Sequence, residues 1–172
     1  MMALQDFDNA ILALQSILTH VRKRFGYSHY RVAIILNNIG ICHYEYGGLL
    51  AALKAFEESV EILRDSINCK NANEEVEGSE DKTKLSILLG RSLENLSFIQ
   101  FNRKEYAESI VALEECLKVY YDVFGNDHKI VKSTIESLAN VMATSNCLDN
   151  KDKLKHMAAM YIDMLGSEHK TI

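Results

Sequence analysis

The sequence predicts an all-α protein built as a right-handed α-solenoid of antiparallel helix hairpins, and three observations support this fold class. Apolar residues recur three and four positions apart along most of the 172-residue chain, which is the period of an amphipathic helix. The chain has no proline and only 8 glycines, so few residues would interrupt such helices. A pattern of small and large side chains also repeats about 42 residues apart, which indicates a repeat architecture.

The expected helices follow from this periodicity and from the glycines that end apolar runs. The first segment places Leu14, Leu18, Val21 and Phe25 on one face, and Gly26 follows it directly. Glycine just past an amphipathic run is the common left-handed helix stop. We expect helices at residues 3–25, 30–46, 49–67, 84–102, 104–124, 129–145 and 150–165.

The repeat is seen in the spacing of the small residues Ala10, Ala52 and Ser109. Each has a large apolar or aromatic residue three positions before it and another four positions after it. The first two lie 42 residues apart, whereas Ser109 lies a further 57 residues along the chain. The extra 15 residues correspond to 68–82, which carry five acidic side chains and almost no apolar ones. We interpret 68–82 as an acidic, flexible insert in one repeat domain covering residues 1–172. A calcium loop or a regulatory partner site is the alternative, although the ligand order of a known calcium loop is missing.

Small side chains recur where two helices of a hairpin would meet. Gly40 and Ser97 occupy equivalent places, and they would let their helices approach Ala52 and Ser109 closely. Large residues such as Phe56 would then fill the space between successive hairpins.

The charge of the chain argues against several classes of partner. A net charge of -5 gives no concentrated basic surface for nucleic-acid phosphates or anionic lipids. The longest nearly apolar run, at residues 11–18, is far shorter than the roughly 20 residues that span a bilayer. We therefore expect a cytoplasmic protein that binds neither nucleic acid nor membrane.

The residues with reactive side chains do not form a recognisable catalytic pattern. The 4 cysteines lack the C-x-x-C spacing of a zinc site or redox pair. His29, His128 and His169 repeat one place in the links between units, and we interpret them as packing and capping residues rather than metal ligands. We expect no enzyme activity, no cofactor and no metal.

One stretch of the chain resembles a known family. Residues 29–40, followed by Gly47, Ala52 and Phe56, are similar to the tetratricopeptide repeat (TPR), in the 42-residue variety of kinesin light chains. The resemblance covers nearly the whole chain apart from the acidic insert. It implies a groove lined by the first helix of each hairpin, in which asparagines at the places of Asn38 and Asn95 grip an extended peptide.

The repeat register places further residues on this inner face. Tyr44, Phe98 and Phe101 have no expected packing role within their own hairpins, so we expect them to face the groove. A generic polar surface whose aromatic residues are covered by a neighbouring helix is the alternative. The candidate groove residues are Asn37, Asn38, Ile41, Tyr44, Arg91, Asn95, Phe98, Phe101 and Asn102.

These features favour a noncatalytic scaffold or adaptor that binds a peptide or protein segment in the concave groove. The alternative is a structural segment that stacks on further repeats or on another copy through uncapped solenoid ends. The chain begins with an unpaired helix of the second type and ends on a linker pattern, so we expect a fragment of a longer array. An enzyme is the third and weakest interpretation.

Overall fold

The computed structural model describes residues 2–68 and 79–145, and over these ranges it contains six helices and no strand. This confirms the all-α helical repeat fold. The helices are α1 (Met2–Phe25), α2 (Tyr30–Glu45), α3 (Leu49–Asn68), α4 (Ser79–Asn102), α5 (Tyr106–Phe124) and α6 (Lys129–Thr144).

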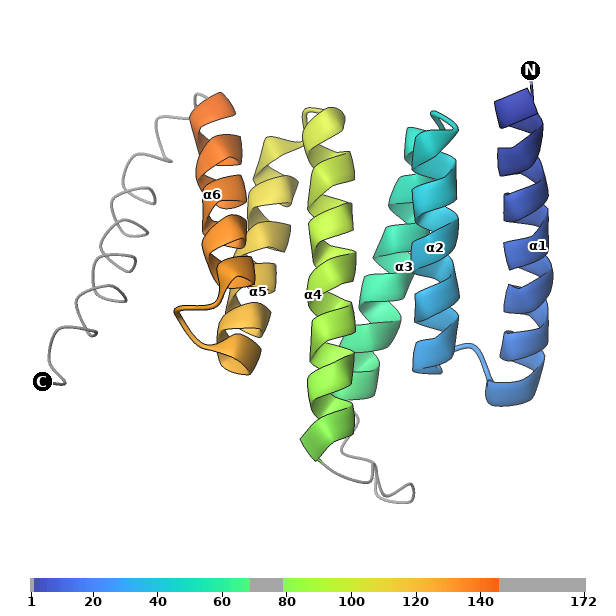
Figure 1. Ribbon diagram of the computed structural model, residues 1–172, viewed down its shortest axis with the longest axis horizontal. Coiled ribbons are helices and arrows are strands. Elements are labelled where there is room, and N and C mark those ends of the chain that lie inside the picture. Colours follow the sequence, from blue (N-terminus) through green and yellow to red (C-terminus); the bar gives the residue numbers. More distant parts are fainter. Residues whose placement is uncertain (1, 69–78, 146–172) are drawn as a thin grey trace, which may run out of the picture.

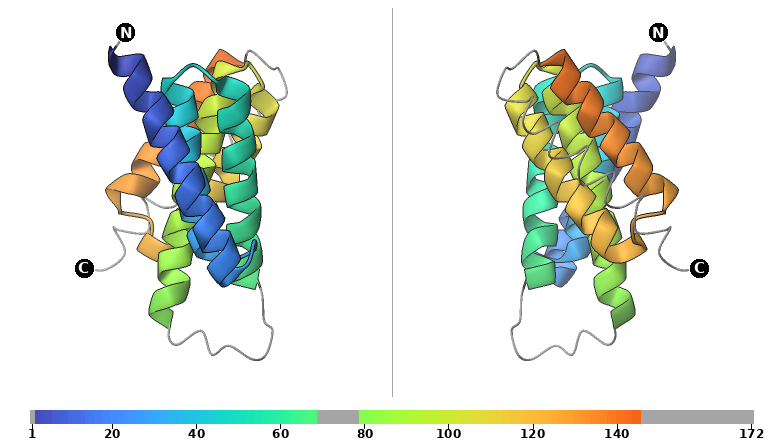
Figure 2. Two further views of the ribbon diagram at one scale, coloured as in Figure 1. Left: turned by 90° about the vertical axis from the view of Figure 1, so that its right-hand side faces the viewer. Right: turned by 90° about the vertical axis from the view of Figure 1, so that its left-hand side faces the viewer.

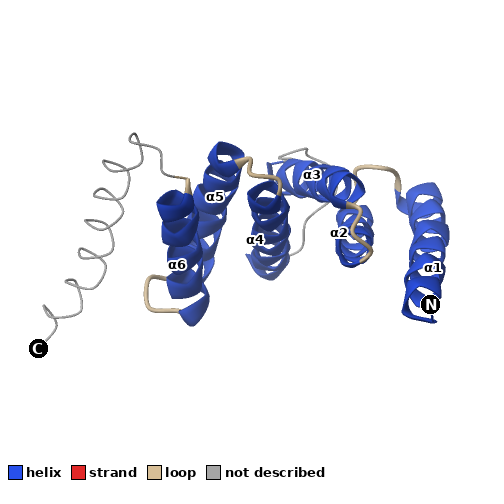
Figure 3. Ribbon diagram, turned by 90° about the horizontal axis from the view of Figure 1, so that it is seen from above, coloured by secondary structure: helices blue, strands red, loops and turns tan. Residues whose placement is uncertain are grey.

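The helices pack in chain order, each against the next, with α2 and α3 forming one antiparallel hairpin and α4 and α5 the next. Figure 1 shows α2, α4 and α6 in one layer, with α3 and α5 in a second layer behind them. Figure 2 shows α1 and α6 lying obliquely across the two ends of the stack. Seen from above, the row of helices is a shallow arch, with α2, α4 and α6 along its inner side (Figure 3).

The helix ends agree with the expected ranges at most positions, and α4 is the exception. It begins at Ser79, whereas we expected this helix to begin at residue 84 and residues 79–82 to belong to the insert. Asn68, the other end of that range, is the last residue of α3. The rest of the expected insert and the helix expected at 150–165 lie outside the described residues.

Two histidines cap helices, as the sequence predicts. The backbone N–H of Arg31 donates to Nδ1 of His29 at 3.2 Å, and that of Ile130 donates to Nδ1 of His128 at 3.3 Å. Each side chain therefore satisfies a backbone donor that has no partner within its helix. The His128 ring also stacks on Phe124. His169 lies outside the described residues.

Small residues allow close approach within each hairpin. A Cβ atom at Gly40 would lie 2.6 Å from Cε1 of Phe56, so only glycine leaves room for this ring. Phe56 is therefore packed within its own hairpin, and our expectation that it fills the space between hairpins is wrong in this respect. The Ser97 and Ser109 hydroxyls are 2.8 Å apart, which confirms the expected pairing of small residues between α4 and α5.

One pair of equivalent positions has different side chains in the two hairpins. In the first hairpin these positions are Ala33 of α2 and Leu63 of α3, and both residues are buried. The equivalent positions in the second hairpin, 57 residues later, are Gly90 and the buried Tyr120. A Cβ atom at Gly90 would collide with the Tyr120 ring, so the larger ring is accommodated by the smaller helix residue.

We expect Gly90→Ala to lower the free energy of unfolding by about 1–3 kcal/mol, because the added methyl overpacks the α4–α5 contact. In a Tyr120→Leu background the same change should be neutral or stabilising by up to about 1 kcal/mol, since alanine has the higher helix propensity. Urea denaturation of the two single variants and the double variant measures this coupling. Equal effects of Gly90→Ala in both backgrounds would contradict the assigned packing.

Candidate functional site

The residues that the sequence predicts for a binding groove lie on two helices of the inner layer. Asn37, Asn38, Ile41 and Tyr44 lie on α2. The other five lie on α4, which is the next helix of the inner layer: Arg91, Asn95, Phe98, Phe101 and Asn102.

A small pocket of about 70 Å³ opens between α2 and α4. Asn37, Asn38 and Arg91 line it, so three of the predicted residues meet here. Asn38 and Arg91 are exposed, whereas Asn37 is half-buried. Leu88 and Ser92 also line the pocket and were not predicted. Ser92 lies three positions before Asn95 on the helix, and this spacing is the sequence signal for a shared face.

A line of hydrogen bonds fixes Asn37 and Asn95 at the junction of α2 and α4. Nδ2 of Asn95 donates to Oδ1 of Asn37 at 3.0 Å. The single proton of the Ser92 hydroxyl can go to the same oxygen, 3.4 Å away, or to the hydroxyl oxygen of Ser59 of α3, 3.1 Å away. The Ser59 hydroxyl donates its own proton to the carbonyl of Ala33 at 2.9 Å. Ser59 and Ser92 are almost fully buried, so these bonds are made away from water.

Asparagine side chains have more hydrogen-bonding capacity than this line uses. Asn37 keeps its amide N–H groups, and Asn95 keeps its carbonyl oxygen. The exposed Asn38 side chain forms no hydrogen bond within the part of the chain that the structure describes. A donor, an acceptor and one complete amide are therefore available at the same junction.

An apolar patch lies next to these amides. The rings of Tyr44 and Phe98 meet edge to face across α2 and α4, with centroids 5.2 Å apart and an interplanar angle of 75°. Phe98 remains 50% exposed and Ile41 40% exposed, which leaves apolar area accessible to a ligand. We call Ile41, Tyr44 and Phe98 the inner apolar patch.

The last two predicted residues take part in the end of the α4–α5 hairpin. The Phe101 ring contacts Tyr106 of α5, with centroids 5.6 Å apart. Our expectation that Phe101 has no packing role within its hairpin is therefore wrong. Nδ2 of Asn102 donates to the backbone carbonyl of Phe98 at 2.9 Å.

A carboxylate occupies the place in α4 that is equivalent to Asn37 in α2. The Tyr120 hydroxyl donates to Oε2 of Glu94 at 3.0 Å. Burial raises the pKa of Glu94, and this hydrogen bond and the charge of Arg91 oppose the rise. Burial and the nearby Glu94 charge raise the pKa of Tyr120 as well, so the phenol keeps its proton.

The described residues do not form a metal or nucleophile site. No group of three or more His, Cys, Asp or Glu side chains among them could hold a metal ion. Burial raises the pKa of the Cys116 thiol, and a neutral buried thiol is a poor nucleophile. None of the helices in these ranges is long and apolar enough to cross a bilayer.

The fold and the inner face define a helical repeat protein, and comparison with known proteins identifies the repeat. Models of the tetratricopeptide repeat match residues 1–65 and 89–128. The chain therefore belongs to the tetratricopeptide repeat family. Such repeats generally mediate protein–protein interactions and are typically noncatalytic scaffolds.

A solved structure shows the same architecture. It is a crystal structure of nearly identical TPR-like repeats from a kinesin light chain candidate of Podosopora anserina. The TM-score is 0.64 with 16% sequence identity, over 97% of this chain and 73% of the other. This likeness concerns the fold alone. No curated protein matches the chain.

We expect Glu94→Gln to raise the free energy of unfolding at neutral pH, because glutamine accepts the Tyr120 hydrogen bond without a buried charge. Because the pKa of Glu94 is raised in the folded wild type, protonation of this group stabilises that protein. The stabilisation is complete below the ordinary pKa of glutamate and is lost as pH rises through the raised pKa. The advantage of the variant should therefore shrink as pH falls into the ordinary range of glutamate. Thermal unfolding of both proteins between pH 3.5 and about 8 measures this difference. A constant difference across that range would contradict a raised pKa.

Proposed function

We propose that the chain is a noncatalytic adaptor that binds an extended protein segment across the α2–α4 junction of its inner face. The main support is the arrangement of Asn38 and the Asn37–Asn95 pair beside an apolar patch. Peptide backbones present alternating donors and acceptors, and amide side chains can bind both. A pair that is already hydrogen-bonded loses little freedom when a ligand binds, which favours affinity.

The size and charge of the junction restrict the ligand. A pocket of about 70 Å³ admits only a small group, so most contact would be made on the open surface and the inner apolar patch. Arg91 is the one cation among the residues that line this pocket, whereas Glu45 and Glu136 are exposed on the same layer and would repel an acidic tail. A segment of mixed apolar and polar or basic side chains fits this surface best.

The outward face of α1 favours groove binding over stacking through this end of the solenoid. Its exposed residues include Asn9, Ser16, His20 and Lys23, which lie together on the side of the helix away from α2. Leu12 is 63% exposed but stands among these polar residues. Terminal repeats of soluble solenoids have such polar outer faces.

We expect Asn38→Ala combined with Phe98→Ala to weaken binding of a selected peptide by about tenfold or more, because the ligand loses a backbone hydrogen bond and an apolar contact. Peptides would be selected from a random display library on the wild-type chain, and their affinities measured by fluorescence anisotropy. The unfolding midpoint should change little, because both side chains are largely exposed.

The control for this test is Lys118→Ala combined with Tyr121→Ala, which removes exposed side chains from α5. It should leave the affinity unchanged. If the inner variant binds as tightly as the wild type, or if both variants lose affinity equally, the proposed groove is wrong.

A further inference from the structure

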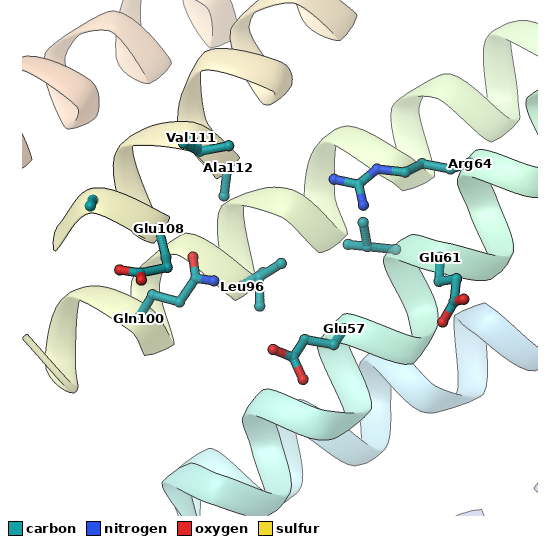
Figure 4. A pocket seen from close by; sticks show the side chains of 10 residues that line it. Glu57, Glu61, Arg64, Leu96, Gln100, Glu108, Val111 and Ala112 are labelled. Atoms are coloured by element: carbon teal, nitrogen blue, oxygen red, sulfur yellow. The ribbon is translucent and has the colours of Figure 1, made fainter. Parts of the chain in front are cut away.

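A second and larger hollow lies on the outer layer of the molecule, between α3 and α5 (Figure 4). Its volume is about 620 Å³, and its floor is made by Leu96 and Gln100 of α4. Val60 of α3 and Ala112 of α5 form its apolar walls. We call this hollow the outer groove. It belongs to the opposite layer from the junction of Asn37 and Asn95.

The floor of the outer groove contains a buried acceptor without a partner. Gln100 is only 9% exposed, and its Oε1 atom has no hydrogen-bond partner in the described part of the chain. Figure 4 shows this amide at the groove, between Glu108 and Leu96. A buried carbonyl oxygen without a donor is unfavourable. This oxygen has less than 1 Å² of accessible surface, so it lies beneath the floor of the groove and not on its open surface.

The rim of the outer groove is acidic on both sides. Glu57 and Glu61 stand on successive turns of α3, and Glu108 lies on α5 at the other side of the groove. All three are exposed, and none is in a direct ion pair with another residue in the described ranges. Three carboxylates around one hollow produce a negative potential there.

Two arginines near the carboxylates are already engaged by other acidic residues, and one of them, Arg64, itself lines the outer groove. Arg64 forms an ion pair with Glu115 across α3 and α5, with Nε donating to Oε1 at 2.8 Å. Arg103 forms another with Glu105 at 2.8 Å. These arginines interact with Glu61 and Glu57 only through longer-range attraction. The acidic rim therefore keeps most of its charge for a ligand.

The apolar part of the outer groove indicates an amphipathic ligand. Val111 is 60% exposed at the edge, next to the walls and the Leu96 floor. A small polyamine would match the carboxylates but would leave this apolar surface uncovered. A protein segment with both cationic and apolar side chains covers the two surfaces together.

We propose that the outer groove is a second binding site, which takes a basic amphipathic protein segment. Lysine or arginine side chains of that segment pair with Glu57, Glu61 and Glu108. An apolar side chain of the segment covers Val111. This site is separate from the inner groove, so one chain can hold two partners on opposite layers.

Three fluorescent peptides of equal length test the proposal on the full chain. One alternates arginine with leucine, the second alternates arginine with serine, and the third alternates glutamate with leucine. The arginine–leucine peptide should bind about tenfold more tightly than the arginine–serine peptide, and the acidic peptide should not bind. Equal binding of both arginine peptides, or competition by an equal concentration of spermidine, would overturn the amphipathic assignment.

Two charge-matched variants show whether binding occurs at this groove. Changing Glu57, Glu61 and Glu108 to glutamine should weaken binding of the arginine–leucine peptide by about tenfold or more. The control Asp8→Asn, Asp122→Asn and Asp127→Asn makes the same change in net charge at exposed positions outside both grooves and should weaken binding of this peptide less than about twofold. Equal losses would show general electrostatic attraction and would overturn the site.

Gln100→Leu separates binding from folding. It should raise the thermal unfolding midpoint, because it removes a buried acceptor that has no partner, and should change peptide affinity less than about twofold, because this acceptor lies beneath the groove floor. A loss of affinity of about tenfold or more would overturn the assignment of binding to the exposed carboxylates and Val111. The inner-groove variant, Asn38→Ala with Phe98→Ala, should bind the arginine–leucine peptide as tightly as the wild type does. The test of the outer groove therefore does not depend on whether the proposed inner groove is correct.

Discussion

The line of hydrogen bonds that joins α2, α3 and α4 is the interaction on which both surfaces of this chain depend. Ser59 donates to the Ala33 carbonyl, Ser92 directs its one proton to Ser59 or to Asn37, and Asn95 donates to Asn37. Its central hydroxyls are almost fully buried, so a change in the spacing of the helices would leave polar groups without partners. The bonds therefore set the register of successive hairpins, which in turn sets the positions of the inner junction and the outer groove.

The next hairpin uses a weaker form of the same connection. The Cys116 thiol donates to the Gly90 carbonyl at 3.3 Å, in the place where Ser59 donates to Ala33. Burial raises the pKa of this thiol, and Thr134 of α6 interacts with it. A neutral thiol is a weaker donor than a hydroxyl. Packing of the Tyr120 ring on Gly90 accordingly has a larger share in holding α4 and α5 together.

The helix period and the capping residues made most of the fold predictable, because both are local signals. The capping role of His29 and of the equivalent His128 could be predicted from their repeated position in the links between units. The start of α4 was misjudged because residues 79–82 were interpreted as loop on account of their acidic charge, although acidic residues are favourable in the first turn of a helix. The bond between Asn37 and Asn95 joins residues 58 positions apart. Its geometry depends on the exact rotation of two helices, which a periodic pattern does not determine.

The contact between Tyr120 and Glu94 explains why the inner junction is confined to one pair of helices. Glu94 of α4 is equivalent in the repeat to Asn37 of α2. An asparagine at position 94 would continue the row of amide side chains into the next repeat. Instead the Glu94 carboxylate accepts the Tyr120 hydroxyl from the outer layer. An acceptor with a negative charge offers no N–H to a peptide carbonyl. The amide contacts that we propose for a peptide therefore end at Asn95, and a ligand that extended past α4 would have to match a different surface.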